Sequence, residues 1–552
     1  MTRFNQRATR AAVHSPVTTT GEQTVTHEGG TGHLRDAKSE LFLLAVSNFV
    51  GQDVFYEKGG QRDDRYTQLV RQLALEDPEW TAGLLGWLRG DGNMRTAALV
   101  GAAEFVWARL DATRNATAPT DGTFDAGWNR RVIASVLQRA DEPGEMLGYW
   151  TSRYGRKLPK PVKRGIADAV QRLYTERALL KYDTDSKGYR FGDVLNLVHA
   201  APDDDKPWQG FLFQHALDRR HGNADEIPEP LHTLHARDAL MKMPTGGRRA
   251  ALDDPNVTEQ FADAGMTWEA LAGWLQRPMD KAAWEAIIPS MGLMALARNL
   301  RNFDEAEVSD AVAAQICERF TDPEQVAKSR MFPFRWWAAY KHAPSLRWGH
   351  ALEQALNHSL SNVPRLKGST LILVDRSPSM FPGYGFSTPN QSDITLAEQA
   401  AVFGSALALR AENPTLVEFG GESKKLTVAK GGSILKHIEA FGQSDGTDIP
   451  SAVKKHWFAH DRIIIVTDEQ TRPGWLPSNM RPYGGMQETM IDDLVPKTTP
   501  VYMWNMAGYK PGAMPSGKSG RHTFGGLTDA AFRLVPLLEA GRDAQWDVIF
   551  GK

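Results

Sequence analysis

The chain has 552 residues, of which 41% are hydrophobic and 24% charged, values typical of a soluble globular protein with more than one domain. Its formal net charge of −2 excludes a global attraction to nucleic acid or membranes, so any anion-binding surface must be local. The single cysteine, Cys317, excludes an internal disulfide and a thiolate metal cluster, and it favours a reducing, cytoplasmic location.

Residues 1–33 are poor in large aliphatic side chains and rich in Thr, Gly and His. They contain no apolar segment of the kind found in secretory signals. We expect this region to be a flexible arm that contributes little to folding. No apolar run elsewhere approaches the roughly 20 residues that cross a bilayer, so we expect no membrane contact.

Residues 34–365 carry helical periodicity almost throughout. Segments such as DRYTQLVRQLALE (64–76), MRTAALVGAAEFVWARL (94–110) and KRGIADAVQRLYTERALL (163–180) place apolar residues three and four apart. Short polar breaks separate them, as between antiparallel neighbours. Many short helix pairs over some 330 residues favour a solenoid-like stack over one compact bundle.

Residues 366–552 have a different pattern, in which short apolar runs alternate with helix-like segments. The runs are TLILV (370–374), TLVEFG (415–420), RIIIVTD (462–468) and PVYMWN (500–505). Continuous apolar strands that alternate with helices predict a parallel sheet covered on both faces, which is a doubly wound, Rossmann-like α/β domain. Ligands of such domains bind at the carboxyl ends of the strands.

Oxygen-bearing side chains gather at these predicted strand ends. Asp375, Ser377 and Ser379 follow the first strand, Thr447 lies in the loop QSDGTD, and Asp468 ends the strand 462–467. Hard oxygen ligands without His or Cys suit Mg²⁺, with Mn²⁺ as the second choice. Each residue alone is better explained as a turn or helix cap, but all five together predict a metal site.

This pattern resembles the metal-ion-dependent adhesion site of a von Willebrand factor A domain. The resemblance implies that Asp375, Ser377, Ser379, Thr447 and Asp468 are direct or water-mediated ligands, and that an acidic side chain of a partner fills an open position. Asp448 is expected to begin a helix. Arg376 and Pro378 depart from the small or apolar residues usual there, and Arg376 would weaken metal binding or help to capture an acidic partner.

The helical region also resembles a known family. The segments GNMRTAAL (92–99), LPKPVKRGIADAVQRLYTERALLKYD (158–183), FGDVLNLVH (191–199), MGLMALARNLRNF (291–303) and SRMFPFRWW (329–337) resemble the TROVE module of the Ro autoantigen and its bacterial relatives. The resemblance implies a monomeric ring of HEAT-like helical repeats closed by the α/β domain. It also implies binding of small noncoding Y-like RNA outside the ring, with single-stranded ends of misfolded RNA in the hole.

A basic segment within the helical region fits such a role. Residues 151–190 hold eleven basic and four acidic residues, a net charge of +7 that leaves −9 for the rest of the chain. Such a local contrast is the expected footprint of a nucleic-acid surface. Pro161 suits the first turn of a helix, where neighbouring cations oppose the helix dipole and a phosphate would offset that repulsion. The predicted RNA contacts are Arg153, Arg156, Lys157, Lys160, Lys163, Arg164, Lys181, Lys187, Arg190 and His199.

Several of these charges have a structural alternative. Arg164, Asp168, Arg172 and Glu176 are spaced four apart, which predicts an ion-pair ladder along one helix face. His199 is more often explained as the cap of a helix end than as a base contact. Four arginines that lie in the family-like motifs on otherwise apolar helices, Arg95, Arg298, Arg301 and Arg330, either line the hole or tie neighbouring repeats together.

The leading hypothesis is an RNA-binding ribonucleoprotein component without enzymatic activity, which serves RNA quality control with an exoribonuclease partner. The alternative is a metal-dependent protein-interaction scaffold that binds an acidic protein ligand and no RNA. An enzyme is the weakest hypothesis, because the motifs supply no general acid or base beside the two strand-end carboxylates.

Overall fold

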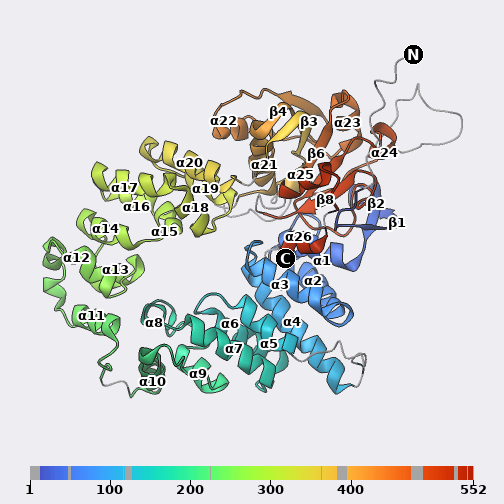
Figure 1. Ribbon diagram of the computed structural model, residues 1–552. Coiled ribbons are helices and arrows are strands. Elements are labelled where there is room, and N and C mark those ends of the chain that lie inside the picture. Colours follow the sequence, from blue (N-terminus) through green and yellow to red (C-terminus); the bar gives the residue numbers. More distant parts are fainter. Residues whose placement is uncertain are drawn as a thin grey trace, which may run out of the picture.

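The structure, a computed structural model, describes residues 13–47, 51–115, 117, 127–223, 226–361, 363–381, 394–473, 489–527, 532–543 and 545–550. Its first part is helical and its second part is a mixed sheet with helices on both faces, which confirms the predicted fold class. In Figure 1 the helices follow one another along a curved path, and the sheet lies where the path returns to its start.

The helical part begins with long helices and continues with shorter ones. Its elements are α1 (Ala37–Ser47), α2 (Gly59–Glu76), α3 (Pro78–Arg89), α4 (Arg95–Arg114), α5 (Gly127–Val136), α6 (Glu142–Tyr154), α7 (Lys160–Leu173), α8 (Glu176–Tyr182), α9 (Phe191–Val198), α10 (Pro207–His221), α11 (His232–Met241), η1 (Thr245–Gly247), η2 (Ala250–Asp253), α12 (Val257–Asp263), α13 (Trp268–Leu275), α14 (Lys281–Ile287), η3 (Ile288–Ser290), α15 (Leu293–Arg298), α16 (Leu300–Glu305), α17 (Asp310–Thr321), α18 (Pro323–Ser329), α19 (Pro333–Lys341), η4 (Leu346–Trp348) and α20 (Gly349–Ser359).

Local chemistry explains where many of these helices begin. Side chains of Asp77, Thr175, Thr267, Asp280 and Asp322 accept backbone N–H groups at the starts of α3, α8, α13, α14 and α18. Each helix then buries one face. In α7, Val162, Ile166, Ala169 and Val170 are buried at helical spacing. Among the described residues, no helix combines the length and apolar character that a bilayer span needs.

The second part contains a six-stranded sheet. Its elements are β3 (Leu366–Asp375), η5 (Pro378–Met380), α21 (Leu396–Arg410), β4 (Ala411–Phe419), β5 (Ser423–Leu426), α22 (Ile434–Glu439), α23 (Ile449–His456), β6 (Arg462–Thr467), α24 (Ile491–Leu494), β7 (Val501–Asn505), β8 (Arg521–Gly525), α25 (Leu534–Glu539) and α26 (Trp546–Phe550). The strand order is β5-β4-β3-β6-β7-β8. All neighbouring pairs are parallel except β4 and β5, so the sheet has one antiparallel edge strand.

Alternate residues of the central strands serve two separate cores. Ile372 and Val374 of β3 belong to the large core that continues into the helical part. Leu371 and Leu373 belong to a smaller core under α23 and α24. Because side chains alternate across a strand, one continuous apolar run supplies both faces.

The amino-terminal residues differ from the expected flexible arm. Residues 13–33 form most of a two-stranded hairpin, β1 (Thr19–Val25) and β2 (Thr31–Arg35), in antiparallel register. The hairpin is tied to the carboxyl-terminal part, for example by reciprocal backbone hydrogen bonds between His33 and Gly512 of 2.9 and 3.0 Å. Arg35 is buried with Glu469 in an ion pair of 2.5 Å. Tertiary contacts therefore order a polar segment that has no core of its own; residues 1–12 lie outside the described residues.

Two further contacts close the curved path of helices. Asn93, after α3, donates to the backbone carbonyl of Arg330, after α18, at 2.5 Å. The Arg330 guanidinium donates in turn to the carbonyls of Arg89 and Gly90. At the chain end, the Trp546 ring of α26 packs against Phe42 of α1 and Trp80 of α3, beside the carboxyl terminus marked in Figure 1.

Histidine burial in β8 makes stability depend on pH. Burial lowers the pKa of His522 to about 4, with Arg521 as a second cause, so the unfolded chain binds a proton that the folded chain does not between pH 6.5 and 4. We predict that stability falls as pH falls through this window, by up to about 3 kcal/mol from this residue. Chemical denaturation of the wild type and of His522→Gln at pH 7 and pH 4.5 checks this, and an equal pH dependence in both proteins would contradict it.

Candidate nucleic-acid interface and metal centre

Both carboxylates of the predicted metal site lie at the carboxyl ends of neighbouring strands. Asp375 ends β3, and Asp468 follows β6, which pairs with β3 in parallel register. The Ser377 backbone N–H donates to Asp375 Oδ1 at 2.9 Å, and the Ser377 and Ser379 hydroxyl oxygens are 3.1 Å apart. Thr447 belongs to the loop before α23. The Thr447 backbone carbonyl accepts the Arg472 backbone N–H at 2.8 Å.

All five of these residues are at most 2% exposed. Burial raises the pKa of Asp375 to about 6, and burial together with the charge of Asp375 raises the pKa of Asp468 to about 7. Thr447 Oγ1 and Asp468 Oδ2 have no hydrogen-bond partner. Two buried carboxylates with oxygen lone pairs to spare fit a hard divalent cation, which would neutralise the pair.

The side chains of the predicted site also restrict which metal it can bind. Within the described ranges, no three His, Cys, Asp or Glu side chains are grouped to hold a metal. The predicted site has two carboxylates, and hydroxyls must supply its other protein ligands. Such a set suits Mg²⁺, which retains several waters, better than a softer metal.

The neighbouring Arg376 does not serve the second of the two roles considered for it, the capture of an acidic partner. Its guanidinium donates to the backbone carbonyls of Gly442 at 2.6 Å and Ala397 at 2.5 Å. The group lies over the Phe381 and Phe441 rings, and the residue is 6% exposed. Arg376 is therefore engaged within the domain and is not available to capture an acidic partner. Asp448, as expected, begins a helix, because its side chain accepts the Ser451 N–H at 2.9 Å.

The β1–β2 hairpin packs beside this site, which sequence patterns did not anticipate. Thr26 Oγ1 donates to the Thr471 carbonyl at 2.5 Å, and the His27 N–H donates to Gln470 Oε1 at 3.0 Å. A Cβ at Gly30 would lie 2.5 Å from the Thr471 carbonyl oxygen, so this close approach needs glycine. The hairpin turn thus contacts Gln470 and Thr471, shortly after Asp468.

In the helical part, five predicted RNA contacts form one group of unpaired cations. No ion pair or hydrogen bond joins their side chains to any other residue that the structure describes. Four are exposed and Lys163 is half-buried. The group, here called the cationic strip, spans the connection from α6 to the first turn of α7 and consists of Arg156, Lys157, Lys160, Lys163 and Arg164.

The helix start within the strip has the predicted form. Lys160 begins α7, Pro161 lies in its first turn, and no side chain caps the helix. The segment 156–164 contains no acidic residue. Unsatisfied N–H groups and uncompensated cations occur together there, which is a favourable environment for a phosphate.

The other predicted contacts are less available. Arg153 pairs with the buried Glu104 at 3.0 Å, and Arg190 pairs with Asp183 at 2.9 Å and Asp185 at 2.8 Å. Lys187 lies 3.6 Å from the Asp141 carboxylate. Lys181 is exposed and lies over the Tyr182 ring, and His199 is the exposed left-handed cap of α9.

The predicted ion-pair ladder along α7 does not form. Asp168 instead accepts two hydrogen bonds of 2.7 Å from Arg130 of α5. Arg172 donates to the Ala134 and Leu137 carbonyls at the end of α5. A bidentate pair and a capped helix end, both offered by the neighbouring helix, are stronger than exposed pairs within one helix.

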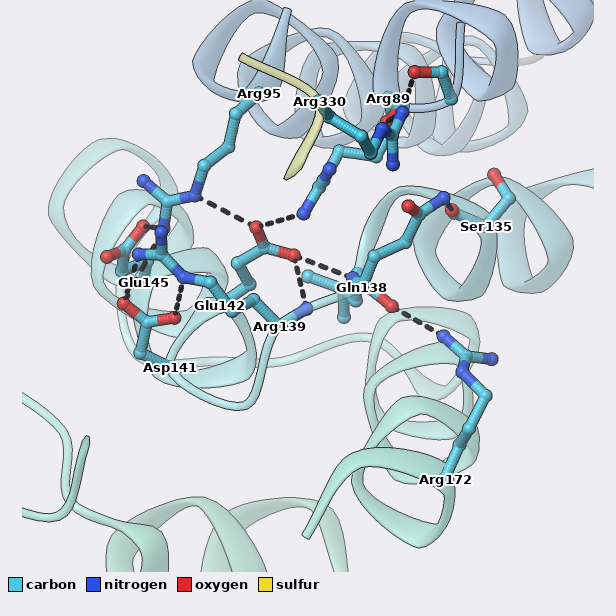
Figure 2. Close-up of polar contacts among 12 residues, drawn as sticks. Arg89, Arg95, Ser135, Gln138, Arg139, Asp141, Glu142, Glu145, Arg172 and Arg330 are labelled. Atoms are coloured by element: carbon cyan, nitrogen blue, oxygen red, sulfur yellow. Dashed lines mark hydrogen bonds and ion pairs between the residues drawn. The ribbon is translucent and has the colours of Figure 1, made fainter. Parts of the chain in front are cut away.

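A buried carboxylate, Glu142, organises the start of α6. It accepts hydrogen bonds from Arg89 at 2.7 Å, Arg95 at 2.9 Å, and the backbone N–H groups of Gln138 and Arg139 at 2.6 and 2.9 Å. Figure 2 shows these groups converging, with Arg330 close to Arg89. Arg95 and Arg330 therefore tie helices together and do not project freely.

Two other arginines of the family-like motifs are exposed and do not tie helices together. Arg298 and Arg301, on α15 and after the start of α16, are exposed. Their side chains have no ion pair or hydrogen bond with another described residue. Of the four arginines considered above for the hole, these two remain available for a ligand.

Removal of the Glu142 charge leaves the buried Arg89 without its carboxylate partner. Glu142 is 0% exposed and Arg89 7% exposed, so we predict that Glu142→Ala lowers the free energy of unfolding by about 3–5 kcal/mol. Glu145→Ala is the matched control, because that side chain is 35% exposed and its loss should cost at most about 1 kcal/mol. Denaturant unfolding of both variants checks this, and equal losses would contradict it.

Comparisons with known proteins found one matching domain family and a solved structure of similar fold. A TROVE domain model matches residues 263–343, which include the predicted motifs at 291–303 and 329–337 but not the cationic strip. The crystal structure of the Deinococcus radiodurans RO (RSR) protein matches with a TM-score of 0.60 and 16% identity, over 90% of this chain and 99% of that chain. No protein with a curated description matches. Residues 263–343 are therefore similar to a TROVE domain, and the chain as a whole has the fold of the Deinococcus radiodurans RO protein.

Proposed function

We propose that this protein is the RNA-binding component of a ribonucleoprotein and that the cationic strip is its main phosphate contact. The observation that carries the proposal is the set of five cations without acidic partners between Arg156 and Arg164. In a chain of net charge −2, such a strip concentrates positive potential where a structured RNA can dock. The TROVE match and the Ro-like fold support the same proposal.

The partner RNA in this proposal is small and structured, of the Y-like class. Structured RNA is held through its backbone and shape, while loose ends stack and thread. The exposed Arg298 and Arg301 lie inside the TROVE match, on helices that do not carry the strip. In this account any nuclease chemistry belongs to a partner protein and not to this chain.

A divalent cation, Mg²⁺ or secondarily Mn²⁺, is proposed at Asp375, Ser377, Ser379, Thr447 and Asp468. The unpartnered Thr447 and Asp468 oxygens and the raised pKa values of both carboxyls support it. The ion would neutralise the carboxylates and fix the loops that face the hairpin. The alternative of an external acidic ligand is less favoured, because the five residues are buried and the hairpin packs beside them.

Substitution in the strip tests the RNA proposal. We predict that Lys160→Ala, Lys163→Ala and Arg164→Ala together weaken RNA binding and reduce the slope of log K against log salt by roughly 0.7–0.9 per lost contact. Filter binding of a small stem-loop RNA across salt concentrations measures both. The control removes Lys242, Lys328 and Lys424, whose side chains are 75–78% exposed elsewhere on the protein. Equal effects in both triple variants would refute a specific strip.

Metal binding has a distinct signature in stability. We predict that Mg²⁺ raises the Tm of the wild type and that Asp468→Asn abolishes this rise. Without metal, Asp468→Asn should be at least as stable as the wild type at pH 8, because it removes repulsion from Asp375. Asp445→Asn, in the same loop as Thr447 but outside the ligand set, should retain the rise. A Mg²⁺-dependent Tm in Asp468→Asn would remove the site from these residues.

A further inference from the structure

A small pocket lies between α6 and the connection from α8 to α9. Its volume is about 170 Å³. Aromatic rings form much of its wall, contributed by Tyr174, Tyr182, Tyr189 and Phe191. The Tyr174 and Phe191 rings are stacked, with centroids 3.8 Å apart and planes 10° from parallel.

Glycines on α6 give the pocket its floor. A Cβ at Gly144 would lie 2.9 Å from the Tyr189 carbonyl oxygen, so this residue must be glycine for the connection to pack so closely. At Gly148, one turn later, a Cβ would meet only the Tyr189 ring edge at 3.9 Å. A side chain at Gly148 would therefore occupy the pocket without a backbone clash.

One polar group in this wall lacks a partner. Tyr174 is 1% exposed, and its hydroxyl makes no hydrogen bond. Burial raises the pKa of this hydroxyl well above its usual value, with Asp183 and Asp141 as lesser causes, so it remains a donor. An unpaired buried hydroxyl is destabilising, and a ligand acceptor in the pocket would satisfy it.

The charges of the wall are already balanced among themselves. Asp141 accepts two hydrogen bonds of 2.6 Å from Arg139, as Figure 2 shows, and Glu145 pairs with Arg95. Lys187 Nζ lies 3.6 Å from Asp141 and 3.8 Å from Glu145, too far for strong hydrogen bonds, and can still donate to a ligand. Balanced charges favour a neutral ligand with donor and acceptor edges over a cation.

We propose that this pocket receives one unpaired nucleobase of the RNA bound at the cationic strip. The inference rests on the proposed function and adds to it a site for a base, where the strip contacts only phosphates. Aromatic walls, a volume suited to one heterocycle, and donors at Tyr174 and Lys187 match the chemistry of a flipped or single-stranded base. The six residue steps from Gly148 to Tyr154 span about 9 Å of α6, and the strip begins two residues later, at Arg156.

The test compares a single-stranded RNA with an abasic strand of the same length, each measured by fluorescence anisotropy. Gly148→Leu should weaken binding of the normal strand roughly tenfold, the loss of one base–aromatic stack. It should leave the abasic affinity and the salt slope unchanged. Ser152→Leu is the matched control, because Ser152 is exposed one turn further along α6, and it should change neither strand.

A second variant isolates the hydroxyl. Tyr174→Phe should weaken binding of the normal strand severalfold. The Tm of this variant should be equal to or above that of the wild-type protein, because an unpaired buried group is removed. Wild-type affinity of folded Gly148→Leu for the normal strand would overturn the base pocket, with the proposed function intact. Failure of the wild type to bind either strand and also the small stem-loop RNA would overturn both. Tetramethylammonium binding that Gly148→Leu abolishes, without any effect on RNA, would assign the pocket to a cation.

Discussion

Three acidic side chains on and near the helices that flank the cationic strip are already paired with cations outside it. Asp168 is held by Arg130, Glu104 by Arg71 and Arg153, and Asp183 by Arg190. Each of these pairs uses a cation outside the segment 156–164. These three carboxylates therefore do not neutralise the strip unless one of the pairs is broken. Buried or bidentate pairs resist such exchange, so the positive charge stays available for phosphates.

The same principle of buried pairing holds the ends of the chain together. Arg35 of the hairpin is fixed on Glu469, which also accepts a hydrogen bond of 2.7 Å from Asn505 of β7. Glu469 directly follows Asp468, so the hairpin anchor and the proposed metal share one strand end. Closure at Arg330 and the packing of α26 on α3 add further joints between segments distant in sequence. The α/β domain is thus built into the path of helices at more than one place.

Much of the α/β domain could be predicted because its central strands are continuous apolar runs that end in oxygen-bearing residues. Asp375 and Asp468 lie at neighbouring strand ends as expected. The edge strand β5 and the last strand β8 were missed, since SKKL and RHTFG carry polar residues within four or five positions. The hairpin was missed for a related reason: its order comes from contacts with Thr471 and Gly512, hundreds of residues away.

In the helical part, the helices could be predicted from the sequence but the contacts between them could not. Helices and the charge excess of 151–190 follow from local patterns, but the partner of each charge does not. Spacing by four predicted a pair between Arg164 and Asp168, while the structure gives Asp168 to Arg130 on the next helix. Likewise, nothing in the sequence around Tyr174 indicates an unpaired hydroxyl. Such features depend on which helices pack together, and that is a property of the whole fold.

The most direct test of the account is to locate bound RNA by ultraviolet cross-linking and mass spectrometry of the intact complex. The account predicts cross-linked peptides that contain residues 155–164, together with peptides around Tyr182 and Tyr189. Efficient cross-linking confined to other surfaces, with the 155–164 peptides recovered unmodified, would contradict it.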